Sequence, residues 1–201
     1  MPPDCSETVC DALLDLIPLG ELNPFALEVA AANIQAVTGL PTDIRPARDL
    51  PADAFMATRR QFDAVKILGM LGAIKDGAPF KMGVIKQDLC IPILTYVYGE
   101  SQMGGHAAVI SLHRLQHIDR RLTYERGAKI AVHEAGHLLG LEHCREPGCL
   151  MRFSKQLEQL DLLPMHFCAP CEYEIARLLK RVTRSRSEAS ALSAQKSKDE
   201  P

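Results

Sequence analysis

Three histidines of this 201-residue chain have the spacing of ligands for a single metal ion. His133 and His137 are four residues apart in a segment of helical pattern, so their imidazoles lie on one face of the helix. Gly140 ends that helix and turns the chain back, which lets His143 approach the same ion. Three neutral imidazoles leave a zinc ion its full charge and its ability to lower the pKa of a bound water to ~7. The chemistry that this spacing predicts is hydrolysis.

Glu134 follows the first of these histidines and is the candidate general base. Its carboxylate is expected beside the open coordination position, outside the ligand set but within reach of a water. It would take a proton from the water that attacks the peptide carbonyl and pass that proton to the leaving amine. The alternative is an ordinary helical histidine pair, because HExxH is short enough to recur by chance. The longer pattern HExxHxxGxxH followed by Met151, which is that of metzincin peptidases, argues against chance.

Four of the seven cysteines lie in the last third of the chain, in two pairs. Cys144 and Cys149 flank a Pro-Gly turn, and Cys168 and Cys171 form a CxxC pair. Four thiolates can complete a tetrahedral zinc site without an open position, so a structural role is expected for this second ion. Two disulfides, or inert buried thiols, are the alternatives.

The third histidine and the first of these cysteines are adjacent in the sequence, yet they are expected to bind different ions. An extended chain allows this, because neighbouring side chains then point to opposite sides. We infer that the cysteine site braces the turn that carries Met151, below the catalytic pocket. The alternative is that Met151 is an ordinary core residue. The remaining cysteines have no partner pattern and are interpreted as packing residues: Cys5, Cys10 and Cys90.

The composition argues against nucleic acid or a membrane as partner. The formal net charge is -2, and 24% of the residues are charged, without an excess of basic residues. No apolar run approaches the ~20 residues of a membrane-spanning helix. The acidic amino terminus lacks the basic region of an export signal. We therefore expect a cytoplasmic protein, a monomer, whose partner is a peptide or protein substrate.

Hydrophobic periodicity predicts an α/β (α+β) domain with a small mixed sheet. Strands are expected at residues 12–17, 84–85, 93–98 and 107–112, and helices at 24–37, 52–74, 123–139 and 172–181. The helix at 123–139 carries the HExxH motif on its last turns, and Gly140 suits its left-handed cap.

One catalytic domain is expected over residues 1–181. Its upper part extends to about residue 140, and its lower part, from about residue 141, is a small subdomain that the second zinc stabilises. Residues 182–201 are rich in Ser, Arg, Lys and Glu, with little to bury, and are expected to form a disordered tail.

The motif region resembles the archaemetzincins, a family of metzincin-clan zinc metallopeptidases. It reads HEAGHLLGLEHCREPGCLM, followed after sixteen residues by CAPC. The resemblance covers about residues 129–171 and implies a compact zincin-like fold, a catalytic zinc on the three histidines and a structural zinc on the four cysteines. It also implies that Met151 is the methionine-turn residue. An edge strand that pairs with extended substrate is implied too, with residues 107–112 as the candidate; the alternative is an ordinary sheet edge.

Two other functions are left open by the sequence. A non-catalytic zinc protein would use the cysteine pairs for binding and keep a vestigial histidine site, but the intact Glu134 argues against it. A nucleic-acid-binding zinc module would use the CxxC pair, and the acidic net charge argues against it. The sequence does not choose among the tyrosines that could stabilise an oxyanion, which are Tyr96, Tyr98, Tyr124 and Tyr173.

Overall fold

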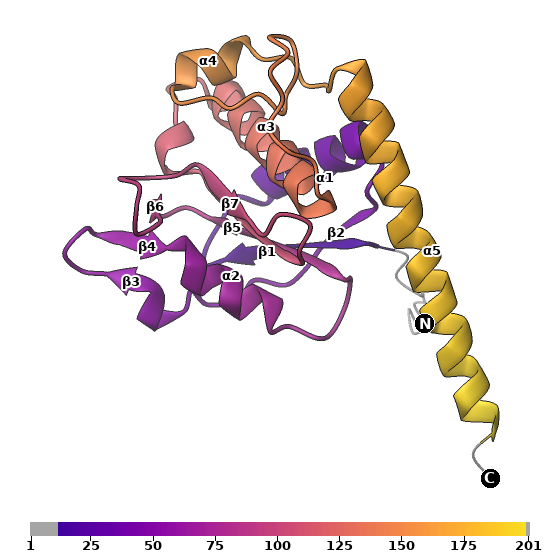
Figure 1. The fold of residues 1–201 in the computed structure, drawn as a ribbon. Coiled ribbons are helices and arrows are strands. Elements are labelled where there is room, and N and C mark those ends of the chain that lie inside the picture. Colours follow the sequence, from indigo (N-terminus) through magenta and orange to yellow (C-terminus); the bar gives the residue numbers. More distant parts are fainter. Residues whose placement is uncertain (1–11, 200–201) are drawn as a thin grey trace, which may run out of the picture.

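A five-stranded sheet in the order β2-β1-β5-β8-β7 is the main element of the computed structural model, which describes residues 12–199 (Figure 1). The strands are β1 (Leu14–Leu19), β2 (Thr42–Ile44), β5 (Phe80–Ile85), β7 (Gly99–Ser101) and β8 (Ala107–Ser111). The first four in that order are parallel, and β7 pairs antiparallel with β8 at the edge. The predicted mixed sheet of an α/β domain is thus confirmed. Cys5 and Cys10 lie outside the described residues.

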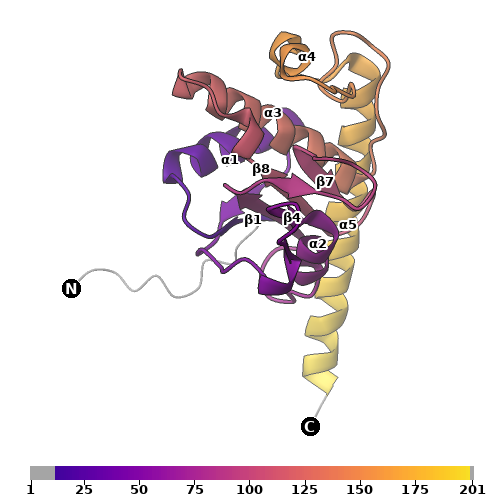
Figure 2. The ribbon, with the colours of Figure 1, turned by 90° about the vertical axis from the view of Figure 1, so that its left-hand side faces the viewer.

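Helices cover both faces of this sheet (Figure 2). α1 (Pro24–Thr38) and α3 (Arg120–Leu139) lie side by side on one face, and α2 (Ala64–Gly72) lies on the other. Successive residues of a strand alternate between the faces, so Ala108 and Ile110 of β8 join the core beneath α3, whereas Val109 joins the core around α2. The central strands therefore support α3, the helix that carries the HExxH motif.

The ends of α1 are set by capping residues. Oδ1 of Asn23 accepts a hydrogen bond from the backbone N–H of Phe25, and Pro24 is the first helical residue. Gly39 closes the helix with φ 73°, a left-handed conformation that glycine adopts without strain.

The single helix predicted at residues 52–74 is wrong. The stretch forms a 3-10 turn (Ala52–Ala54), the strands β3 (Phe55–Met56) and β4 (Gln61–Asp63), and only then α2. Arg60, with φ 53°, turns the chain between the two strands, and Asp63 caps α2. β4 also pairs with β6 (Leu89–Cys90), which gives a second sheet of order β3-β4-β6. The apolar spacing fits a helix, but a left-handed turn residue interrupts it.

The strand predicted at residues 93–98 is also wrong, since this stretch is irregular and leads into β7. Side chains bond its carbonyl groups in place of a neighbouring strand. Arg59 donates to the carbonyls of Leu94 and Thr95 at 2.6 and 2.7 Å, and Gln61 donates to that of Thr95 at 2.9 Å. Residues 107–112 do not form the predicted edge either. They correspond to β8, which lies between β5 and β7, and the edge strand is β7.

The last helix, α5 (Ala169–Asp199), is longer than the helix predicted at 172–181 and projects beyond the rest of the fold (Figure 1). It continues through residues predicted to be disordered. Residues 182–199 contain neither glycine nor proline and include many good helix formers. The division into a domain of residues 1–181 and a separate tail stays a prediction. No helix in the described part of the chain is long and apolar enough to cross a membrane.

Candidate active site

The end of α3 and the turn after it bring three histidines together. Asp119 caps the start of α3, and Gly140 ends it with φ 101°. The Nε2 atoms of His133 and His137 lie 3.1 Å apart. The turn returns the chain so that Nε2 of His143 lies 3.2 Å from Nε2 of His137. The three predicted ligands therefore meet at one point.

Backbone carbonyl groups fix the tautomer of two of these imidazoles. Nδ1 of His133 donates to the carbonyl of Leu150 at 2.9 Å, and Nδ1 of His137 donates to that of Leu141 at 2.7 Å. With the proton on Nδ1, each Nε2 presents a lone pair to the shared point. Burial lowers the pKa of all three histidines, that of His133 to about 4, so the imidazoles are neutral at pH 7.

Three neutral imidazoles at these separations fit a zinc ion. No proton lies between the Nε2 atoms of the first two histidines, so their lone pairs repel one another unless a cation separates them. Tetrahedral coordination with Zn–N distances of ~2.0–2.1 Å places two nitrogens about 3.3 Å apart. The observed Nε2 separations of 3.1 and 3.2 Å are close to that value.

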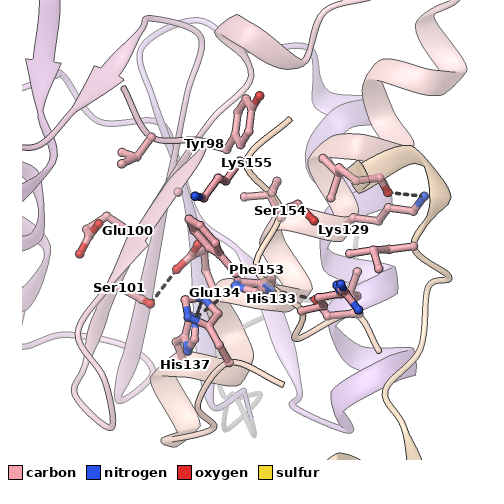
Figure 3. Close-up of a pocket in the computed structure, with 18 of the residues that line it drawn as sticks. Tyr98, Glu100, Ser101, Lys129, His133, Glu134, His137, Phe153, Ser154 and Lys155 are labelled. Atoms are coloured by element: carbon pink, nitrogen blue, oxygen red, sulfur yellow. Dashed lines mark hydrogen bonds between the residues drawn. The ribbon is translucent and has the colours of Figure 1, made fainter. Parts of the chain in front are cut away.

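Glu134 lies beside the histidines and is buried (Figure 3). Burial raises the pKa of its carboxyl to about 8, against the opposite effect of a hydrogen bond that its Oε2 accepts from Oγ of Ser101 at 2.7 Å. A Cβ on Gly99 would lie 2.7 Å from Oε1 of Glu134, so this position leaves room for glycine alone. The sequence did not predict Ser101 or Gly99 as site residues. Their contacts with Glu134 span more than 30 residues, and no local pattern signals them.

Met151 lies beneath the same helix and is fully buried. A Cβ on Gly136 would lie 2.6 Å from Sδ of Met151, so the methionine approaches the helix this closely only because residue 136 is glycine. The backbone N–H of Cys144 donates to the carbonyl of Met151 at 2.9 Å. The residue after His143 is thereby tied to the methionine.

The four predicted cysteines converge in a second cluster. Their sulfur atoms lie within 4.8 Å of one another, and none of the four is in a disulfide. Sγ of Cys144 lies 3.7 Å from Sγ of Cys168, well beyond the ~2.05 Å of an S–S bond. Backbone N–H groups of Glu146 and Cys168 donate to sulfur atoms of the cluster, each at 3.4 Å, which favours thiolates. The two clusters are consistent with two zinc sites.

A cavity of about 510 Å³ opens in front of the histidines (Figure 3). One wall comes from residues 94–103, which include β7. The other comes from residues 152–155 and from α4 (Leu157–Leu162). Tyr96 and Tyr98 line the cavity, whereas Tyr124 contacts Phe25 and Tyr173 is exposed. Among the tyrosines, the candidates for an oxyanion donor are therefore Tyr96 and Tyr98.

Three neutral histidines converge at the wall of a cavity large enough for a peptide, at the end of a helix that packs against a mixed sheet. This fold and site define a zinc metallopeptidase. The model of peptidase family M54 matches residues 25–177, and the chain belongs to that family, the archaemetzincins. Archaemetzincin from Archaeoglobus fulgidus is 37% identical over 154 residues, which cover 77% of this chain and 93% of that protein. Its crystal structure, complexed with malonate, has a TM-score of 0.72 at 36% identity and covers 80% of this chain and 98% of that one. The crystal structure of archaemetzincin from Methanopyrus kandleri has a TM-score of 0.78 at 30% identity, with coverages of 87% and 98%. The resemblance seen in the sequence is confirmed.

Proposed function

We propose that peptide bonds are hydrolysed at a zinc ion held by His133, His137 and His143, with Glu134 as the general base. The observation that carries this proposal is the convergence of three neutral imidazoles beside the buried carboxyl group of Glu134. A second, structural zinc would be held by Cys144, Cys149, Cys168 and Cys171, and Met151 would be the methionine-turn residue. A peptide substrate follows from the family. Monomeric state and cytoplasmic location stay predictions.

The chain's own residues supply orientation and proton transfer. When bound, the zinc ion polarises the peptide carbonyl and lowers the pKa of a water to ~7. The positive charge of a bound zinc ion would favour the ionised form of Glu134, whose carboxylate takes up the proton that the attacking water loses and returns it to the nitrogen of the leaving amine. Oγ of Ser101 holds this carboxylate through Oε2, so the base is already in place when substrate binds. The carbonyls of Leu150 and Leu141 keep Nε2 of two histidines free of a proton.

β7 is our candidate for binding the substrate backbone, in place of residues 107–112. The backbone groups of Tyr98 and Gln102 form hydrogen bonds with β8. Because the hydrogen-bonding direction alternates along a strand, the N–H and C=O groups of Gly99 and Ser101 point to the open edge. An extended peptide that pairs with these groups lies along the cavity, beside the histidines.

Gly99→Ala is expected to lower kcat on the order of 10²-fold, because the added methyl group displaces the carboxylate of Glu134. The measurement is kcat on a cleaved peptide, with a thermal melt to show that the protein is folded. Gly69→Ala in α2 is the matched control, since nothing lies within 4 Å of its Cβ position, and it should leave kcat unchanged. A Gly99→Ala protein with the parent kcat would show that this contact does not position the base.

Metal analysis together with digestion of a peptide library tests the proposed function. Two zinc ions per chain are expected, one of which His137→Ala removes and the other of which Cys171→Ser removes. Cleavage, mapped by mass spectrometry, should stop with a chelator and return with added zinc, and the products distinguish cleavage at chain ends from internal cleavage. One zinc in total, or cleavage that the chelator leaves unchanged, would refute the assignment.

A further inference from the structure

Three basic side chains line the cavity in front of the histidines: Lys129, Arg152 and Lys155. A cation in a substrate cavity selects an anionic ligand when the protein itself has not already neutralised it, because the ligand then supplies the missing partner. The hydrogen bonds of each side chain therefore decide which of the three is available to substrate.

Lys129 is not available. Its side chain is 2% exposed and forms an ion pair with Glu125 at 2.8 Å. Its Nζ also donates to the carbonyls of Leu160 and Asp161, both at 3.2 Å. A protonated lysine has three N–H donors, and these three acceptors use them all. Lys129 thus ties α4 to α3 and offers the cavity only its methylene groups.

Lys155 has a different environment. It lies four residues after Met151, and Figure 3 shows its amino group directed into the cavity, between Tyr98 and Phe153. Among the residues that the structure describes, its Nζ has neither an ion pair nor a hydrogen bond, although its backbone N–H donates to Oε1 of Gln159 at 2.9 Å. The backbone of Lys155 is therefore anchored, while its exposed side chain reaches the cavity with an amino group that has no partner among the described residues.

Arg152 is the third cation, and one donor of its guanidinium group is already bonded to the backbone. Its Nη1 donates to the backbone carbonyl of Arg145, at 3.4 Å, on the loop between two of the cysteines. The opposite wall of the cavity carries the carboxylate of Glu100. The free positive charge in the cavity is thus on the side formed by residues 152–155, and the negative charge of Glu100 disfavours a second carboxylate on the side of β7.

We propose that Lys155 binds a carboxylate of the peptide substrate and makes the enzyme prefer peptides that carry this group near the scissile bond. Lys155 lines the same cavity as the three histidines, so the carboxylate that it binds lies within a few residues of the cleaved bond. Its source is either an Asp or Glu side chain or the free carboxyl terminus of a short peptide. This inference rests on the proposed function, because it concerns the substrate of the same cavity.

Matched peptides test the inference on the zinc-loaded protein. The value of kcat/KM is measured for peptides that carry Glu or Gln at each of two positions on either side of the cleaved bond, and for short peptides with a free or an amidated carboxyl terminus. One of these carboxylates should be preferred on the order of tenfold. Its position identifies the source as a side chain or a chain end.

Three variants show whether Lys155 causes this preference. Lys155→Met should abolish it by raising KM for the carboxylate peptide to the value for the uncharged peptide. Lys155→Arg should keep most of it. Lys75→Met, at an exposed lysine that does not line the cavity, should leave it intact. The preference should also weaken between 0.1 M and 1 M salt, as the Debye length shortens from ~10 to ~3 Å.

Peptide binding, measured without cleavage, separates this inference from the proposed function. In Glu134→Gln protein, fluorescence polarisation compares the affinities of labelled Glu and Gln peptides, with and without Lys155→Met. A preference in binding that Lys155→Met removes supports the inference even if no peptide is ever cleaved, in which case the proposed function alone fails. The same preference in both proteins, or none in the parent, would overturn the role of Lys155.

Discussion

Glu134→Gln is expected to lower kcat on the order of 10³-fold while the protein keeps both zinc ions. Glutamine has nearly the same shape, and its carbonyl oxygen can still accept the hydrogen bond from Ser101, but it takes no proton from water. The melting temperature should not fall, since the amide is uncharged and keeps the hydrogen bond from Ser101. The measurements are kcat on a cleaved peptide, zinc per chain and a thermal melt.

Glu142→Gln is the matched control for this prediction. Glu142 lies on the turn between Gly140 and His143. It is exposed and does not line the cavity, so its replacement should leave kcat unchanged. If Glu134→Gln protein that retained its zinc cleaved peptide at the parent rate, Glu134 would not be the general base.

The double variant Cys168→Ser, Cys171→Ser is expected to lose one zinc ion and on the order of 5 kcal/mol of folding free energy. The stretch between Gly140 and Cys168 contains only one short helix, α4, so a metal site is expected to be its principal restraint. Activity should fall as well. Cys144 is adjacent to His143 and is bonded through its backbone to Met151, so loosening the cluster displaces the third histidine.

Zinc content, the melting temperature and kcat measure this effect. Cys90→Ala is the control, because Cys90 is buried far along the chain from the cluster and should cost only about 1 kcal/mol. An unchanged melting temperature and an unchanged kcat in the double variant would show that the cysteine cluster does not support the histidine site.

The sequence predicted the arrangement of side chains best where it depends on spacing along one segment. The geometry of a helix places His133 and His137 on one face, and Gly140 sets the point at which the chain turns back. The two cysteine pairs follow the same logic, because ligands of one ion must converge whatever the surrounding fold. These features lie within residues 129–171, so local rules were sufficient to find them.

Features that depend on contacts between distant segments could not be predicted in this way. The irregular course of residues 93–98 depends on hydrogen bonds from Arg59 and Gln61, which lie more than 30 residues earlier. The identity of the edge strand depends on the pairing of β7 with β8, and the contact of Ser101 with Glu134 joins segments more than 30 residues apart. Periodicity reports which residues are apolar, but it does not report which distant side chains bond the backbone.

The contact between Gly136 and Met151 shows that the packing of the HExxH helix depends on a second segment of the chain. Glycine within a helix is less stable than alanine by about 0.5–1 kcal/mol, and here the sulfur of Met151 fills the space that a side chain would take. If only this helix were transplanted into another scaffold, the helix would keep the destabilising glycine at position 136 but would lack the methionine that packs against it. A transferable unit must therefore include the turn with Met151, or carry alanine at position 136 and give up the methionine.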